Sequence, residues 1–111
     1  MRSYLIDELH PEAVQKVTEQ LDQEGLKGSL DGIYWVEVPQ DLLTPVQAEH
    51  HSECGPYVFS LEVGTTWIKL ELLVRTRGTF RCHCSQYALP EQRDFVMGYV
   101  DRLFDSLDIQ T

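Results

Sequence analysis

The sequence lacks any long apolar run, and no segment approaches the roughly 18 apolar residues that a membrane-spanning helix needs. Its opening residues, MRSYLIDELH, also lack the apolar centre of a secretory signal peptide. Cysteine is scarce: the chain has three, an odd number that fits a reducing compartment better than a disulfide framework. Together these absences predict a cytoplasmic protein without membrane contact.

Basic residues are few as well. The chain has 9 lysines and arginines against 18 aspartates and glutamates, a formal charge of −9. Binding to a nucleic-acid backbone depends on neutralising many phosphates, so this composition argues against nucleic acid as the main partner. The 111 residues are 42% hydrophobic, which is ordinary for one folded domain spanning 1–111.

Familiar catalytic motifs are missing too. The sequence contains no G-x-S-x-G, P-loop, G-x-G-x-x-G or H-E-x-x-H pattern. Nothing in it argues for an enzyme, and no catalytic residue is assigned.

Hydrophobic periodicity and turn residues nevertheless define most elements. The expected order is an edge strand at 3–6, a helix over 11–24, a strand over 33–38, a short helix over 44–51, strands over 57–63, 66–75 and 79–84, and a helix from Pro90. This order predicts an α+β two-layer sandwich: an antiparallel sheet of about four strands, with the N-terminal and C-terminal helices on one face and a short helix between the first two strands.

Helix ends can be assigned from single residues. Gly25 followed by Leu26 is typical of a left-handed C-cap with a hydrophobic contact. Thr44, with proline next and Gln47 at the third helical position, is typical of a capping box.

The cysteines Cys82 and Cys84 flank His83 in an expected strand. A tight turn at Gly64 that pairs Val63 with Thr66 sets Phe59 opposite Leu70 and Leu61 opposite Ile68. A three-residue loop before the next strand then puts Cys84 beside Leu70. Both cysteines are therefore expected to be side-by-side core residues, with His83 exposed beside Glu71.

A second interpretation uses the same residues for chemistry. Cys54, Cys82 and Cys84 with His50 or His51 have the ligand types of a zinc site, or of a thiol redox sensor. The expected register separates Cys54 from the other two thiols by roughly 14 to 19 Å, which a zinc ion cannot bridge. This separation favours the core interpretation and no cofactor, unless 50–55 folds back over the sheet.

Arginine clusters on the expected hairpin between the strands 66–75 and 79–84. Arg75, Arg77 and Arg81 suit an anion or RNA site, but Arg81 and His83 are also expected to flank Glu71 across the strands. Cross-strand charge pairs on a solvated face are the favoured interpretation.

The sheet face opposite the core is expected to bind protein, because it is more apolar than a solvent face requires. We assign this contact to Val58, Trp67, Leu73, Arg75, Arg81 and His83. The predicted function is a small acidic protein-binding or adaptor module, with a protein partner or self-association as a homodimer through this face or through Phe104 of the last helix.

Two segments carry a resemblance. PQDLLTPVQAEHHSECGPYVF and CHCSQYALPEQRDFV resemble a family of small uncharacterised bacterial proteins grouped as a domain of unknown function. The resemblance covers the middle and C-terminal two-thirds and implies no activity or site residue.

Overall fold

The strands and the two long helices occupy separate layers in the computed structural model, which describes residues 2–28, 30–76 and 85–109. The strands are β1 (Ser3–Ile6), β2 (Ile33–Glu37), β3 (Tyr57–Val63), β4 (Ile68–Glu71), β5 (Leu73–Thr76) and β6 (Gln86–Tyr87). The helices are α1 (Pro11–Gln23), α2 (Pro45–Glu49), α3 (His51–Cys54) and α4 (Pro90–Ser106), with a 3₁₀ turn η1 (Gln40–Leu42) before α2. The fold is α+β with an antiparallel sheet, as predicted.

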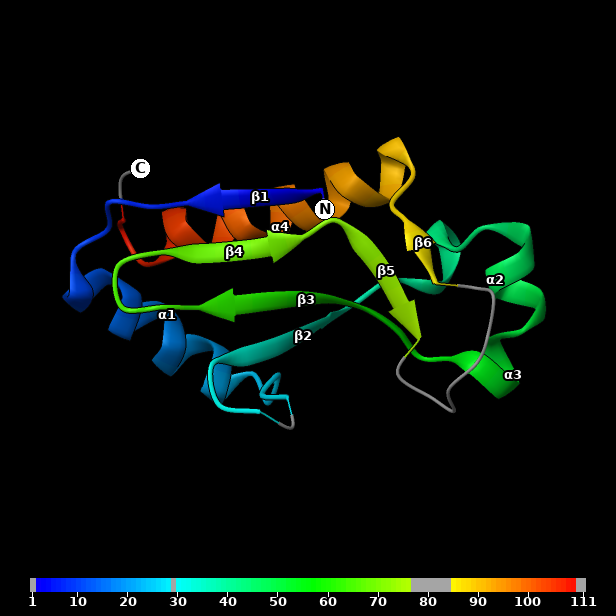
Figure 1. Cartoon of the computed structure of the whole chain (residues 1–111), viewed down its shortest axis with the longest axis horizontal. Helices are drawn as coiled ribbons and strands as arrows, with labels where there is room; N and C mark the ends of the chain where they lie inside the picture. Colours follow the sequence, from blue (N-terminus) through cyan, green and yellow to red (C-terminus); the bar gives the residue numbers. More distant parts are fainter. Residues whose placement is uncertain (1, 29, 77–84, 110–111) are drawn as a thin grey trace.

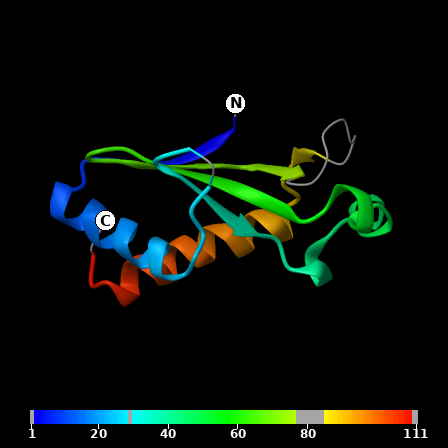
Figure 2. The same ribbon diagram turned by 90° about the horizontal axis from the view of Figure 1, so that it is seen from below.

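The two long helices lie on one face of the sheet. Figures 1 and 2 show α1 and α4 behind the strands in one view and beneath them in the other. Within the described residues, no helix covers the opposite face (Figure 2). We call this uncovered side the open face.

Local sequence signals set the ends of α1. Pro11 occupies the first turn, and Val14, Val17 and Leu21 are buried at helical spacing. Gly25 has a φ of 73°, and Leu26 N–H donates to the Leu21 carbonyl at 3.2 Å. This is a left-handed cap of the Schellman type, so the expected C-cap is confirmed.

Among the described residues the sheet has six strands rather than about four. The strand order is β1-β4-β3-β5-β6, and β2 pairs with the other side of β3. Strands β4 and β5 follow one another in the chain and pair with successive parts of β3, so together they form one strand path. Val63 pairs with Ile68 and Leu61 with Leu70, so the predicted register is wrong by two residues. The error arose because Gly64–Trp67 forms a longer loop than a tight turn. A two-residue shift keeps each side chain on its expected face.

A bulge separates β4 from β5. From Leu61 to Val58 the strand β3 advances three residues, whereas the facing path from Leu70 to Arg75 advances five. The extra residues centre on Leu72, whose N–H donates to the Arg2 carbonyl at 3.0 Å and whose carbonyl accepts from Ala88 N–H at 2.9 Å. Leu72, at the bulge, is therefore hydrogen-bonded both to the residue before β1 and to the residue after β6.

The predicted neighbour of Leu70 is also wrong. Leu70 pairs with Tyr4 of β1 on its outer side, the position expected for Cys84. In addition, Val74 pairs with Gln86, so β5 does not continue into a three-residue hairpin. The sequence suggested a strand at 3–6 but gave no signal for where in the sheet it would insert. Cys82, His83 and Cys84 themselves lie outside the described residues.

The core lies between the sheet and the two long helices. Tyr57, Phe59 and Leu61 of β3 are at most 1% exposed, and they face Val17, Leu21, Val96 and Val100 of the helical layer. Phe104 is also buried, at 4% exposure. The expectation that Phe104 is a spare contact residue is therefore wrong: it belongs to the core.

A buried pair of glutamines docks α2 against α4. Gln47 and Gln92 are 1% and 0% exposed, and Gln92 Nε2 donates to Gln47 Oε1 at 3.0 Å and to the Leu42 carbonyl at 2.9 Å. Gln47 Oε1 also accepts from Thr44 N–H, and Thr44 Oγ1 accepts from Gln47 N–H, which confirms the capping box. One side chain thus caps its own helix and holds its neighbour.

Among the described residues, no helix is both long and apolar enough to cross a membrane.

Candidate functional site

The open face is formed by the side chains of the sheet that point away from α1 and α4. Rows cross the sheet from strand to strand: Leu5 lies opposite Lys69, Lys69 opposite Glu62, and Glu62 opposite Ile33. Beside this row, Trp35 lies opposite Ser60, and Leu73 opposite Tyr87. Leu5 is 52% exposed and Tyr87 39%, whereas Trp35, Trp67 and Leu73 are half-buried.

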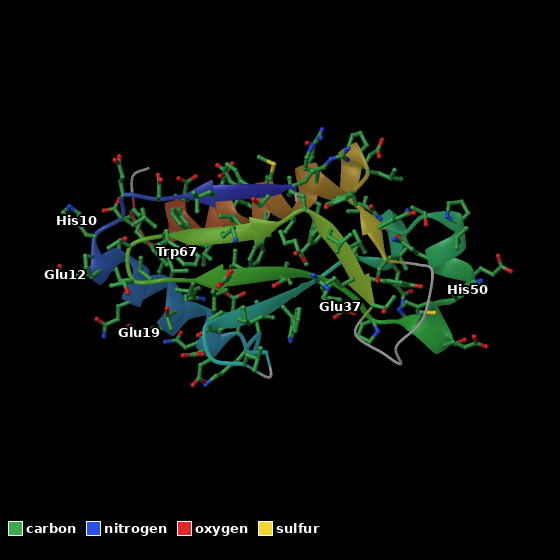
Figure 3. All side chains as sticks on the ribbon, viewed as in Figure 1. His10, Glu12, Glu19, Glu37, His50 and Trp67 are labelled. Atoms are coloured by element: carbon green, nitrogen blue, oxygen red, sulfur yellow. The ribbon has the colours of Figure 1, made fainter. Side chains whose placement is uncertain are left out.

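Two tryptophans on this side pack against glycine backbone. A Cβ atom added to Gly64 would lie 2.1 Å from Cε2 of Trp67, and one added to Gly28 would lie 2.6 Å from Nε1 of Trp35. No other residue type fits under either indole without moving it. Trp67, labelled in Figure 3, lies at the start of β4 where the β3–β4 loop closes. Both rings are therefore held in place without a helix covering them.

Four of the charges on the open face form two pairs, whereas Glu37 forms no ion pair with the residues described. Arg75 donates from Nε to Glu71 Oε1 at 2.6 Å and from Nη2 to Oε2 at 3.1 Å, a bidentate pair that spans the β4–β5 bulge. This hydrogen bond to Glu71 raises the pKa of Arg75. Lys69 Nζ lies 3.9 Å from Glu62 Oε1. The middle of the face is thus polar but largely neutralised, and its apolar groups flank it.

The residues predicted to bind a partner are only partly brought together. Trp67 and Leu73 do lie on the open face, and Arg75 lies beside them. Val58 is 3% exposed, so its side chain is not accessible to a partner. Arg81 and His83 lie outside the described residues. Trp35, Ile33 and Tyr87 were missed, although the alternation of IYWVEV would have placed Ile33 and Trp35 on this face.

Of the expected arginine cluster, only Arg75 lies within the described residues. Arg75 is engaged by both oxygens of Glu71, which is only 12% exposed, instead of presenting a free guanidinium. Arg77 and Arg81 lie outside the described residues. The partner of Glu71 is thus Arg75 from its own strand path, because the bulge brings the two side chains together.

The predicted cysteine and histidine site can be examined at α3, which carries Cys54 and His51. Cys54 is 6% exposed and disulfide-bonded. The expected separation of Cys54 from both other thiols does not agree with a disulfide, and Cys82 and Cys84 lie outside the described residues. His50 is exposed, and the ring of His51 lies 6.0 Å from that of Tyr57. Within the described ranges, no three histidine, cysteine or acidic side chains cluster as a metal site.

A groove at the opposite end of the molecule was not foreseen from sequence. Its volume is about 410 Å³, and it lies between the β1–α1 connection and the end of α4. Its lining residues are Glu8, Leu9, His10, Glu12, Ala13, Lys16, Asp108 and Ile109. Glu8 and Asp108 have φ values of 57° and 58°. Figure 3 shows His10 and Glu12 pointing outward from this end, so their polar groups do not converge on a point.

The positive φ of Asp108 has a local cause. Asp108 N–H donates to the Asp105 carbonyl at 3.1 Å and Ile109 N–H to the Phe104 carbonyl at 2.9 Å, the same cap that Gly25 forms on α1.

Comparison of this chain with family models, curated proteins and solved structures returned no match.

Proposed function

We propose that this chain is a small protein-binding module without a catalytic role, and that the open face binds its partner. The observation that carries the proposal is the pair of indoles, Trp35 and Trp67, each packed on a glycine of an uncovered sheet face. Leu73 and Tyr87 extend the apolar area on the same side. Aromatic anchors are the residues that contribute most at protein interfaces.

The fixed positions of the Trp35 and Trp67 indoles favour binding. A side chain that is already held loses little conformational freedom when a partner covers it, so more of the burial energy appears as affinity. Glycine backbone beneath each ring supplies this restraint for Trp35 and Trp67.

The paired charges favour the same function. Covering an ion pair that already has its partner costs less than covering a lone charge. On the open face, Glu71 is paired with Arg75 and Glu62 with Lys69. A partner would therefore present apolar groups to Trp35, Trp67 and Leu73, and a basic rim would suit the acidic remainder of the chain.

The test is capture of partners from a lysate by immobilised wild-type protein and by two apolar-to-arginine variants. Leu73→Arg adds a charge on the open face, whereas Val46→Arg adds the same charge on α2, where Val46 is 53% exposed. We expect a specific partner to be retained by the wild type and Val46→Arg and lost from Leu73→Arg. Equal retention by all three proteins would place the contact elsewhere.

A second candidate function is thiol redox sensing, and the disulfide at Cys54 favours it. Disulfides in the cytoplasm are usually transient and regulatory, so a cytoplasmic location and this disulfide agree if the bond is reversible. Thiol counting by alkylation and mass spectrometry, before and after mild reduction of the folded protein, tests this. A gain of two thiols without loss of structure supports sensing, whereas unfolding on reduction indicates a structural bond. Metal analysis of the untagged protein tests the zinc version.

A further inference from the structure

The two edges of the sheet are protected very differently. Along β2, the segment before it closes the edge: Gly28 N–H donates to the Ile33 carbonyl at 2.7 Å, and Trp35 N–H donates to the Leu26 carbonyl at 2.8 Å. On the side of the sheet away from β2, β1 has β4 as its only neighbouring strand among the described elements. Figure 1 shows β1 as the outermost strand on that side.

Hydrogen-bond alternation shows which groups of β1 point outward. Leu72 N–H bonds to the Arg2 carbonyl, and the register continues as Tyr4 with Leu70 and Ile6 with Ile68. In an antiparallel ladder every second residue faces its neighbour, so the N–H and C=O groups of Ser3 and Leu5 point away from β4. Ser3 is exposed, and Leu5 is 52% exposed.

The usual protections of an edge are mostly missing from β1. Ser3–Ile6 contains no charge, no proline and no bulge, and its four-residue length is its only protection. Charges instead lie at its two ends: Arg2 precedes the strand, and Asp7 and Glu8 follow it. All three residues are exposed, and the Arg2 guanidinium lies over the Tyr87 ring at 4.9 Å from its centre.

We propose that a second copy of this chain pairs with β1 in an antiparallel arrangement and continues the sheet across a twofold axis. Antiparallel pairing brings Arg2 of each copy to Asp7 and Glu8 of the other, whereas parallel pairing would bring like charges together. When Tyr4 of one copy lies opposite Tyr4 of the other, Ser3 of each copy lies opposite Leu5 of the other. The outward backbone N–H and C=O groups of these two residues then hydrogen-bond to each other. The two Leu5 side chains then lie diagonally across the new pair, within contact range.

This self-association is weak and independent of the open-face function. Four residues per strand bury far less than the roughly 1,200 Å² of a standard interface, so we expect a dissociation constant between about 10 µM and about 1 mM. Sedimentation of the full chain across this range should show a concentration-dependent monomer–dimer equilibrium. A strict monomer at about 1 mM would overturn the proposal.

Leu5→Pro tests the edge directly. The Leu5 N–H points outward, so proline there removes an intermolecular bond and keeps the β1–β4 ladder. We expect the dimer to disappear while far-ultraviolet circular dichroism stays unchanged. A folded Leu5→Pro protein that dimerises like the wild type would contradict the proposed edge.

Charge exchange tests the orientation and does not depend on how Leu5→Pro folds. Arg2→Glu and Asp7→Arg should each weaken the dimer by about 2- to 30-fold, because symmetry disturbs two exposed pairs at once. The double variant restores opposite charges and should recover most of the affinity. Lys16→Glu, an exposed change of the same sign on α1, is the control for Arg2→Glu. Failure of the double variant to recover would rule out the antiparallel arrangement. Loss of a partner from Leu73→Arg with dimerisation intact separates the two proposals.

Discussion

The two faces of the sheet come from the same strands but are stabilised in different ways. On the covered face, apolar side chains contact one another and the helices, as Phe59 and Leu61 do at 0% exposure. On the open face, the indoles of Trp35 and Trp67 rest on glycine backbone, and charges are held in pairs. On an uncovered face, packing on glycine backbone and ion pairs can thus replace the contacts that a second layer would make.

The charge distribution follows the same division. Helices α1 and α4 carry seven acidic and three basic side chains. Among the described residues the ion pairs lie elsewhere, at Lys27–Asp31, Lys69–Glu62 and Arg75–Glu71. The helical layer therefore supplies unpaired negative charge, which favours solubility, and the open face supplies a nearly neutral surface, which favours contact.

The largest expected difference between the faces is in unfolding free energy. Phe59→Ala removes a fully buried ring from the covered face and should cost about 3–5 kcal/mol. Its chain neighbour Ser60 points to the open face and is partly exposed, so Ser60→Ala should change stability by less than about 0.5 kcal/mol. Urea unfolding measures both. Similar costs at the two positions would mean that the faces are not stabilised as described.

A smaller effect is expected beneath Trp67. Gly64→Ala places a methyl group 2.1 Å from Cε2 of the indole, so the ring must move, at a cost of about 1–3 kcal/mol. Tryptophan emission should shift to longer wavelength as the ring becomes more exposed. Gly98→Ala is the matched control on α4, because its Cβ meets only the flexible Arg102 Nη1 at 3.2 Å. We expect that variant to be neutral or more stable, since alanine favours helix.

A third effect concerns the contact between the two long helices. Tyr99 Oη donates to Glu24 Oε1 at 3.0 Å, and burial, followed by this hydrogen bond, raises the pKa of Tyr99. A raised pKa in the folded state contributes stability that is complete below the tyrosine's unfolded value, about 10, and is lost at higher pH. Tyr99→Phe should cost about 0.5–1 kcal/mol at neutral pH and reduce the alkaline loss of stability.

Tyr34 keeps part of that alkaline dependence in the variant. Burial and its hydrogen bond to Asp22 also raise the pKa of Tyr34. Thermal unfolding between about pH 8 and pH 11 therefore should show a reduced slope rather than none. An unchanged slope in Tyr99→Phe would contradict the assignment.

Features set by neighbouring residues were predictable from sequence, and features set by distant ones were not. The caps at Gly25 and Thr44 depend on a few adjacent residues, and both were predicted. The pairing of β1 with β4 joins residues more than sixty positions apart, and the Gln47–Gln92 contact joins residues 45 apart. No local periodicity encodes such contacts. The bulge at Leu72 was hidden for another reason: a two-residue shift leaves the alternation of apolar side chains intact.

The candidate site, too, could be predicted from sequence only where neighbouring residues determine it. Alternation identified Trp67 and Leu73 as outward-facing, but it could not show that Val58 is buried or that Glu71 binds Arg75. The Glu71–Arg75 pair spans the β4–β5 bulge, which the alternation of apolar residues does not reveal.

The smallest expected effect is at the Glu71–Arg75 pair on the open face. Glu71→Gln keeps the shape of the side chain but removes its charge, and we expect a loss of about 0.2–1 kcal/mol. The upper part of that range applies because the geometry is bidentate and Glu71 is only 12% exposed. Salt screens exposed charges, so the difference from the wild type should shrink as ionic strength rises. Glu37→Gln is the control, since Glu37 is exposed on the same face and forms no ion pair with the residues described. Urea midpoints at low and high salt that separate the two variants would show that paired charge stabilises the open face. Identical midpoints would leave the glycine-backed indoles as the main source of its order.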